Sequence, residues 1–405
     1  MTGRRTHVRF PFGRYLHPVG DDFVAVEIAS GIVLFAAAAV ALIVANIWTG
    51  AYTDLWTYEL TVGTGTLAIT YDLRHWVNEG LMTVFFLVVG MEIKRELIEG
   101  ELRDRRTAAL PVIAAVGGMA VPALIFLAWN PSAPASDGWG ITTATDLAFA
   151  LAVLALVAPQ VPAGLKLFLL TLAVVDDTGS VLVITLFYSR DVQISWVFAE
   201  MGVLLVLVAL SRLRVRPRAF YVPVTFAVLW FCTAKAGLSG ALIGALLGLI
   251  TPARSRDERH VLHRVEAPLH LAASFVIVPL FALANAGIQL GPGELRSAGS
   301  GSITWAIVVA RVVGKPLGIT LAIALALHFG LGRLPGSVTR RQILGVSALA
   351  GIGFTVALFI ADVSYGGERL ADAKLGILAS ALGAGVVGCC FLLRSTRPTM
   401  PGGGG

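Results

Sequence analysis

The chain has 405 residues, of which 56% are hydrophobic and only 14% are charged. Soluble domains carry about 25% charged residues, so this composition excludes an ordinary soluble protein and predicts a membrane protein. The net charge of +6 would also suit a nucleic-acid-binding protein, but the distribution of the charges, described below, argues against nucleic acid as a partner.

The first apolar run begins after four arginines and extends from about residue 23 to residue 47. A cleaved signal peptide is the alternative reading. The run is longer than the apolar core of a signal peptide and has the length of a membrane span. We therefore expect a cytoplasmic tail over residues 1–20, a transmembrane domain over 21–395 and a disordered tail over 396–405.

Eleven further apolar stretches follow, so the sequence predicts an all-α polytopic membrane protein with twelve transmembrane helices. The twelve predicted spans are 24–48, 78–98, 108–129, 142–158, 165–188, 195–211, 219–235, 237–252, 268–289, 303–328, 342–364 and 374–393. Between the first two, residues 56–71 alternate β-forming side chains around a Gly-Thr-Gly turn. That pattern predicts a small extramembrane β-hairpin.

The basic residues provide an independent test of this topology. If the N-terminus is cytoplasmic, the cytoplasmic segments contain 23 of the 31 Lys and Arg residues and the opposite side contains six. The remaining two, Arg311 and Lys315, fall inside a predicted span. Cytoplasmic loops of membrane proteins are enriched in Lys and Arg. We therefore expect both termini in the cytoplasm, and a lipid bilayer rather than nucleic acid beside the basic segments.

Five charged residues stand out within the predicted spans: Asp146, Asp176, Asp177, Arg311 and Lys315. A charge at the centre of a bilayer costs roughly 2.5–3.5 kcal/mol on insertion scales, and such residues commonly mark an ion path. Structural ion pairs between helices are the alternative explanation for any one of them.

Asp176 and Asp177 are adjacent in the middle of the span 165–188. Neighbouring helical residues point about 100° apart, so one carboxylate is expected to face a helix partner and the other a cavity. A buried carboxylate can release a proton and then bind a hard cation through the same oxygens. That competition is sufficient for cation/proton exchange.

Lys315 directly precedes Pro316 and is flanked by Gly314 and Gly318. Proline removes a helical hydrogen bond and leaves backbone carbonyls that need another partner. A buried lysine can pair with an aspartate. Lys315 is therefore either a fixed counter-charge or a second proton carrier, and the sequence leaves both roles open.

Asp146 lies in a helix interrupted by threonines, and residues 351–360 form a second apolar span interrupted by Gly and Thr. The two occupy corresponding positions in two three-helix groups, roughly 108–188 and 303–393. Broken helices expose partial charges at their ends, positive at N-termini and negative at C-termini. Asp146 and Lys315 are suited to neutralise these, although close helix packing also explains the Gly/Thr pattern.

Six motifs in order along the chain resemble those of the NhaA family of sodium/proton antiporters, over about residues 22–393. They are HWVNEGLMTVFFLVVGMEIKREL, TATDLAFA, VVDDTGS, PLFALANAG, GKPLGI and GIGFT. The resemblance implies twelve helices with inverted repeats, the fourth and eleventh being unwound and crossing at the midplane. It implies electrogenic, pH-regulated export of Na⁺ or Li⁺ in exchange for a larger number of protons, without a cofactor, across a bacterial inner membrane.

The resemblance also implies residue roles. Asp177 would be the principal cation ligand, Asp176 the partner of Lys315, and Asp146 the compensating charge beside Thr145. The cytoplasmic pH-sensing cluster of the family falls on Glu92, Arg95, Glu96, Arg264 and Glu266. The hairpin at 56–71 resembles the element through which members form homodimers.

Two positions depart from the family pattern. Ser239 replaces a histidine that is tied to pH response in a well-known member. Arg311, one turn before Lys315, is not a family hallmark. We expect its charge to stabilise the ionised form of Asp176 and so to shift activity towards lower pH.

Other function classes fit the sequence less well. Intramembrane aspartyl proteases place their two aspartates on separate helices, and the sequence contains neither a His-Glu-x-x-His nor a Gly-x-Ser-x-Gly motif, so an enzyme is not expected. A cation channel, or a transporter of related fold for another solute such as an organic anion, remains the alternative.

Overall fold

The computed structural model describes residues 21–65, 68–158, 160–188, 193–212, 221–251, 261–291, 301–332, 334 and 338–395. The expected tails, 1–20 and 396–405, lie outside these residues.

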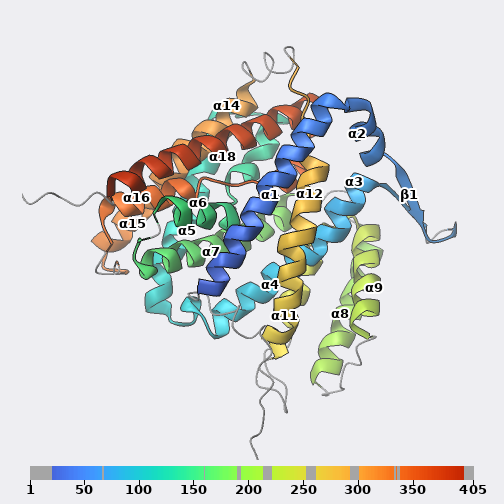
Figure 1. Ribbon diagram of the computed structural model, residues 1–405. Helices are drawn as coiled ribbons and strands as arrows, with labels where there is room; N and C mark the ends of the chain where they lie inside the picture. Colours follow the sequence, from blue (N-terminus) through green and yellow to red (C-terminus); the bar gives the residue numbers. More distant parts are fainter. Residues whose placement is uncertain are drawn as a thin grey trace, which may run out of the picture.

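Helices make up most of the described chain, and Figure 1 shows them packed as one bundle. The order is α1 (Asp21–Ile47), α2 (Thr49–Trp56), β1 (Glu59–Val62), β2 (Ile69–Asp72), α3 (Leu73–His75), η3 (Trp76–Leu81), α4 (Met82–Ile98), η4 (Glu101–Arg103), α5 (Arg105–Trp129), η5 (Ala135–Thr142), α6 (Leu147–Val157), α7 (Ala163–Phe187), α8 (Ile194–Arg212), α9 (Tyr221–Ala236), α10 (Gly240–Ile250), α11 (Val261–Ala272), η6 (Ala273–Ile277), α12 (Val278–Asn285), α14 (Ser302–Val309), η7 (Ala310–Gly314), α15 (Lys315–His328), α16 (Arg340–Leu349), α17 (Thr355–Ser364) and α18 (Gly367–Ser395).

Six of the described helices are long and apolar enough to cross a membrane, or seven if η5 and α6, which meet at a bend of 48°, form one broken span. The six are Ala25–Ile47, Thr107–Trp129, Ala163–Phe187, Val265–Asn285, Ser302–His328 and Gly367–Ser395. Four shorter apolar helices, Ile194–Val206, Phe226–Ala236, Gly240–Ile250 and Thr355–Ser364, accompany them. These helices define a multi-pass membrane protein.

Two helices are interrupted by short unwound segments, and these two segments lie side by side. The first break, residues 143–146, separates η5 from α6, and the second, residues 350–354, separates α16 from α17. The Asp146 amide donates a hydrogen bond to the Ile352 carbonyl, with an N–O distance of 2.8 Å. The predicted spans 142–158 and 342–364 are thus each broken near the Gly- or Thr-rich motif.

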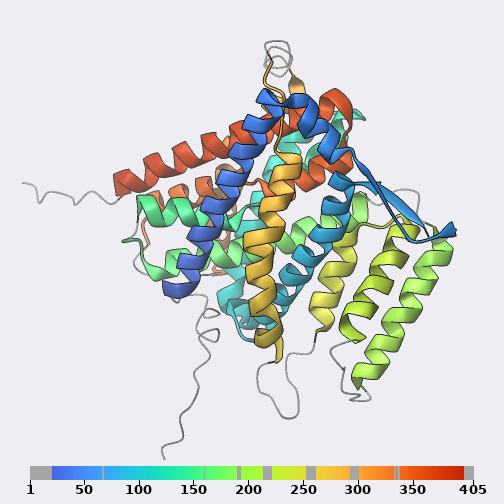
Figure 2. The same cartoon turned by 45° about the vertical axis from the view of Figure 1, so that its right-hand side comes forward.

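The hairpin is an antiparallel pair in which Glu59 faces Asp72 and Val62 faces Ile69. It projects from the side of the helical bundle in both views (Figures 1 and 2). Gly63 and Gly65 have φ angles of 104° and 58°, a conformation that glycine adopts without steric cost. The predicted hairpin is therefore confirmed, except that its first predicted residue, Trp56, ends α2 and its second strand extends to Asp72.

Two packing contacts frame the interior of the bundle. Helix α1 runs beside α11 and α12 in both views (Figures 1 and 2). Helices α4 and α10 approach closely because Gly244 and Gly248 of α10 lie against the backbone of α4; a Cβ at either position would overlap the carbonyl of Thr83 or of Leu87. Such glycine contacts allow membrane helices to pack backbone against backbone.

Candidate functional site

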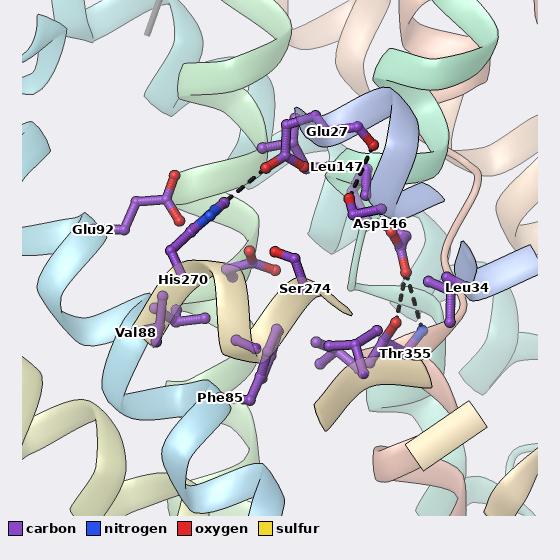
Figure 3. A pocket seen from close by; sticks show the side chains of 18 residues that line it. Glu27, Leu34, Phe85, Val88, Glu92, Asp146, Leu147, His270, Ser274 and Thr355 are labelled. Carbon is purple, nitrogen blue, oxygen red and sulfur yellow. Dashed lines mark hydrogen bonds and ion pairs between the residues drawn. The ribbon is translucent and has the colours of Figure 1, made fainter. Parts of the chain in front are cut away.

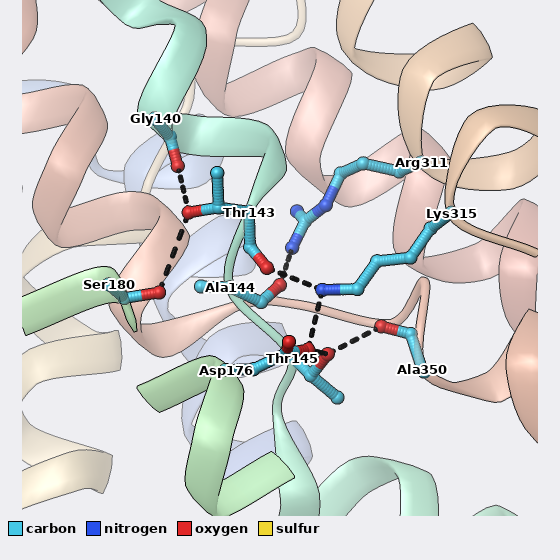
Figure 4. A network of polar contacts seen from close by, with 9 residues as sticks. All are labelled: Gly140, Thr143, Ala144, Thr145, Asp176, Ser180, Arg311, Lys315 and Ala350. Atoms are coloured by element: carbon cyan, nitrogen blue, oxygen red, sulfur yellow. Dashed lines mark hydrogen bonds and ion pairs between the residues drawn. The ribbon is translucent and has the colours of Figure 1, made fainter. Parts of the chain in front are cut away.

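Asp176, near the middle of α7, forms an ion pair with Lys315 at the start of α15. Both side chains are fully buried, and the Lys315 Nζ lies 2.8 Å from Asp176 Oδ2. The same ammonium donates a hydrogen bond to the Thr143 carbonyl in the first break (Figure 4). The pair therefore joins α7 to the first break and to α15.

Thr145 connects this pair to the second break. Its hydroxyl lies 2.5 Å from Asp176 Oδ2 and 2.8 Å from the carbonyl oxygen of Ala350 (Figure 4). A hydroxyl group has a single proton to donate, so Thr145 donates to one of these oxygens at a time. When it donates to Ala350, its contact with Asp176 is compatible with a protonated carboxyl group that donates in return.

Asp177 faces a different direction and lines a pocket, as the divergence of adjacent helical residues predicts. The carboxylates of Glu27, Glu92 and Asp146 line the same pocket. Within the described part of the chain, Asp177 Oδ1 and Asp176 Oδ1 are buried and have no hydrogen-bond partner. Buried polar atoms are nearly always paired, so these two oxygens are free to take a proton or a cation.

Asp146 caps two half-helices at once. Its Oδ2 accepts hydrogen bonds from the Thr355 hydroxyl at 2.7 Å and the Thr355 amide at 3.2 Å (Figure 3). Its Oδ1 accepts from the Phe149 amide at 3.4 Å. Thr355 begins α17, and Phe149 lies in the first turn of α6. A carboxylate is stabilised at helix N-termini because their N–H groups and dipoles point towards it.

Arg311 is fully buried and binds backbone rather than a carboxylate. Its Nη2 donates to the Ala144 carbonyl at 2.7 Å (Figure 4), and its Nη1 donates to the Gly353 carbonyl at 2.8 Å. The sequence predicted a charge acting on Asp176. That charge effect stays a prediction, and the hydrogen bonds of the guanidinium go to one carbonyl of each unwound segment.

The expected pH-sensing residues lie on α4 and α11. Arg95 forms ion pairs with Glu266 at 3.0 Å and with Glu92 at 3.5 Å, so the structure brings these three together. Glu96 is buried on the same helix as Arg95. Arg264 belongs to α11, but its side chain lies outside the described part of the structure.

Ser239, which stands where a well-known family member has a histidine, caps the N-terminus of α10. Its side chain accepts a hydrogen bond from the Ala241 amide at 3.2 Å. It therefore has a local structural contact in place of a titrating group.

Sequence reasoning missed an ion pair that lines the pocket. The His270 Nε2 on α11 lies 3.3 Å from Glu27 Oε1 on α1 (Figure 3). A histidine within a long apolar span was the available signal, because ionisable residues in such spans need a partner. Thr355, whose hydroxyl and amide bind Asp146, lies in the GIGFT motif, but the sequence alone predicted no role for it.

A multi-pass fold that holds a buried Asp–Lys pair and a carboxylate facing a pocket is typical of ion-coupled membrane transporters. The family model described as "Na+/H+ antiporter 1" matches residues 21–392, so the chain belongs to this family.

Curated relatives agree with this assignment. The chain is 40% identical to Na(+)/H(+) antiporter NhaA 2 of Sorangium cellulosum, over 96% of this chain and 92% of the relative. It is 41% identical to Na(+)/H(+) antiporter NhaA of Escherichia coli O1:K1 / APEC, over 93% and 98%. It is 42% identical to Na(+)/H(+) antiporter NhaA of Salmonella paratyphi A, over 91% and 96%.

Proposed function

We propose that this protein exchanges sodium for protons across a membrane. The observation that carries this proposal is the unpaired, buried oxygen of Asp177 beside a pocket that contains three further carboxylates, in a chain of the Na⁺/H⁺ antiporter family. Hard cations such as Na⁺ are bound through oxygen, as are protons on carboxylates. The two ions therefore compete for the same atoms, and each can displace the other. The protein is a transporter and not an enzyme, and it uses no cofactor.

In this proposal, Asp177 is the principal ligand for Na⁺ or Li⁺, and Asp176 is the second carboxylate of the exchange. Lys315 holds Asp176 until the carboxyl takes up a proton or a cation, and Asp146 compensates the half-helix ends beside Thr145. The direction is export of Na⁺ against entry of a larger number of protons, so transport is electrogenic and serves Na⁺ and pH homeostasis.

We further propose the finer architecture. The chain has twelve spans, with the two broken helices crossing at the midplane, in a bacterial inner membrane with both termini in the cytoplasm. We place the opening of the pocket that Asp177 lines on the side on which α1 begins; Glu27, in the second turn of α1, is among its lining residues. Regulation by pH acts through the cluster of Glu92, Arg95, Glu96, Arg264 and Glu266, next to this opening.

The test is ion exchange by the purified protein in liposomes that contain a pH-sensitive dye. We expect addition of Na⁺ or Li⁺ outside, but not K⁺, to raise the internal pH as protons leave in exchange. Asp177→Asn is expected to abolish the signal. Asp54→Asn, a matched change at an exposed aspartate of α2, is expected to leave it unchanged.

A dye signal that stays flat from about pH 6 to pH 9 in the wild-type protein would contradict sodium/proton exchange. Passive cation current through the liposomes, lost in Asp177→Asn, would identify a channel instead. Exchange driven by organic anions would identify a transporter of related fold for another solute.

A further inference from the structure

Arg311 lies on the π-helical turn η7, four residues before Lys315. Residues four apart share one face of a helix, and both side chains reach the first break, Arg311 at Ala144 and Lys315 at Thr143 (Figure 4). Their partners differ. Lys315 holds Asp176 and the Thr143 carbonyl, whereas Arg311 holds the Ala144 carbonyl of the first break and the Gly353 carbonyl of the second.

The backbone carbonyls of the two breaks need hydrogen-bond donors from elsewhere in the protein. Carbonyl groups of an unwound segment lose their helical hydrogen bonds, and the membrane interior supplies no water to replace them. Guanidinium carries several donors in a fixed planar fork and therefore binds two acceptors at a set spacing. A single ammonium does not impose such a spacing.

The second break is shaped around this side chain. A Cβ at Gly353 would overlap the Arg311 Nη2, and a Cβ at Gly351 would lie 2.6 Å from the Arg311 carbonyl oxygen. Glycine at these two positions lets the guanidinium and the backbone of η7 approach the break. Gly353 therefore leaves room for the Arg311 guanidinium and the Ala144 carbonyl, and Gly351 leaves room for the backbone of η7.

We propose that Arg311 is a positioning residue that clamps the two breaks at a fixed separation and thereby sets the geometry of the cation site. The neighbours of the clamped carbonyls carry site contacts: Thr145, next to Ala144, touches Asp176, and Thr355, two residues after Gly353, donates to Asp146. A shift of either break would therefore move the oxygens that line the pocket. The effect on cation affinity rests on the proposed function, whereas the clamp itself rests on the geometry.

The first experiment measures the clamp without transport. Amide hydrogen exchange is followed in the detergent-purified protein for peptides that contain Asp146 and Thr355, since the Asp146 amide donates to Ile352 across the two breaks. We expect Arg311→Met to speed exchange of these amides roughly tenfold or more, because it removes two hydrogen bonds from a charged donor. Arg394→Met, a matched change at an exposed arginine of α18, is expected to leave exchange unchanged.

The second experiment separates clamping from charge. In liposomes we expect Arg311→Met to raise the KM for Na⁺ roughly tenfold or more, with a smaller change in kcat. Arg311→Lys keeps the charge but loses the fork and is expected to restore KM only in part. If Arg311→Met does not fold, Arg311→Gln, whose amide reaches a single carbonyl, takes its place in both experiments.

Unchanged exchange of the Asp146 and Thr355 amides in the neutral variant would overturn the clamp. A full restoration of KM by Arg311→Lys, together with a neutral variant that only shifts the pH profile to higher pH, would also overturn it and assign Arg311 a purely electrostatic role. A wild-type protein that does not exchange Na⁺ would refute the proposed function but leave the amide-exchange test of the clamp intact.

Discussion

At the scale of single residues, the site combines a charge pair that is buried from water with Asp177, which is partly exposed and lines the pocket. Asp176 and Lys315 are both fully buried, and each is tolerated because the other neutralises it. Replacing both partners of such a pair is usually far less harmful than removing one, because a single removal leaves an uncompensated buried charge. This asymmetry is measurable here.

We expect Lys315→Met to lower the free energy of unfolding by about 3–5 kcal/mol, since it leaves the Asp176 carboxylate without its cation. The double variant Asp176→Asn with Lys315→Met should lose clearly less than the sum of the two single variants. Thermal unfolding of the four proteins in detergent measures the difference. Strictly additive losses would show that the two side chains do not interact in the folded protein.

A second prediction concerns Asp146 and the donors that it satisfies at the starts of α6 and α17. Asp146→Ala removes the acceptor of the Thr355 hydroxyl and amide and of the Phe149 amide. Each buried donor left without a hydrogen bond lowers the free energy of unfolding by about 1–3 kcal/mol. Asp146→Asn keeps one carbonyl oxygen and should cost less. Denaturation midpoints compare the two variants with Asp54→Ala, a control at an exposed aspartate; equal loss in the Ala and Asn variants would argue against the capping role.

At the scale of the elements, sequence patterns predicted those features that depend on local order. The hairpin followed from alternation around a glycine turn, and the divergence of Asp176 and Asp177 followed from helical geometry. The breaks near Asp146 and Gly353 followed from Gly and Thr within apolar spans. Each of these is fixed within one turn or one strand.

The features that the sequence did not predict depend on contacts between segments that are distant in the chain. The partner of Arg311 could not be read from the chain, because the carbonyls that it binds exist only where two helices unwind side by side. The Glu27–His270 pair joins α1 to α11 in the same way. The π-helical turns η3, η6 and η7, found in the described part of the chain, have no pattern of their own in the sequence.

Helix packing leads to a third prediction, at the contact between α4 and α10. A Cβ at Gly244 would overlap the Thr83 carbonyl, so Gly244→Ala forces α10 away from α4, and overpacking of this kind costs about 1–3 kcal/mol. Gly202→Ala on α8 meets open space and should be neutral or stabilising by up to about 1 kcal/mol. Melting temperatures of the two variants test the contrast, and a similar loss in both would count against close backbone packing.

At the scale of the whole molecule, the hairpin is the feature that stands apart from the bundle. All four residues of β1 are exposed, while hydrogen bonds from Trp76 to the Leu60 carbonyl at 3.0 Å and from Lys235 to the Ala68 carbonyl at 3.1 Å fix its base. A strand with unpaired backbone groups is a ready site for pairing with another chain. We propose that a second copy of this chain pairs there to form a homodimer.

If this proposal holds, the wild-type protein is a dimer in detergent, and replacing residues 60–71 with a short Gly/Ser linker gives a monomer whose helical bundle stays folded. Light scattering of the purified protein gives the mass of the protein in the complex, and circular dichroism verifies helix content. The control is Thr61→Ala with Thr70→Ala, which removes a side-chain contact of 2.8 Å within the hairpin but keeps its backbone. A linker variant that remains dimeric would place the interface on the helices.

The breaks also have a consequence for how the chain is made. The contacts of the first break with Arg311, Lys315 and Thr355 span 167, 172 and 209 residues of sequence. At a synthesis rate of about 5–20 residues per second, Asp146 leaves the ribosome roughly 10–40 s before the threonine that satisfies it. During that interval its carboxylate, like that of Asp176, must be protonated or kept out of lipid. The first break therefore lacks these partners until the last third of the chain is made, and until then Asp146 depends on protonation or on a polar environment for its carboxyl group.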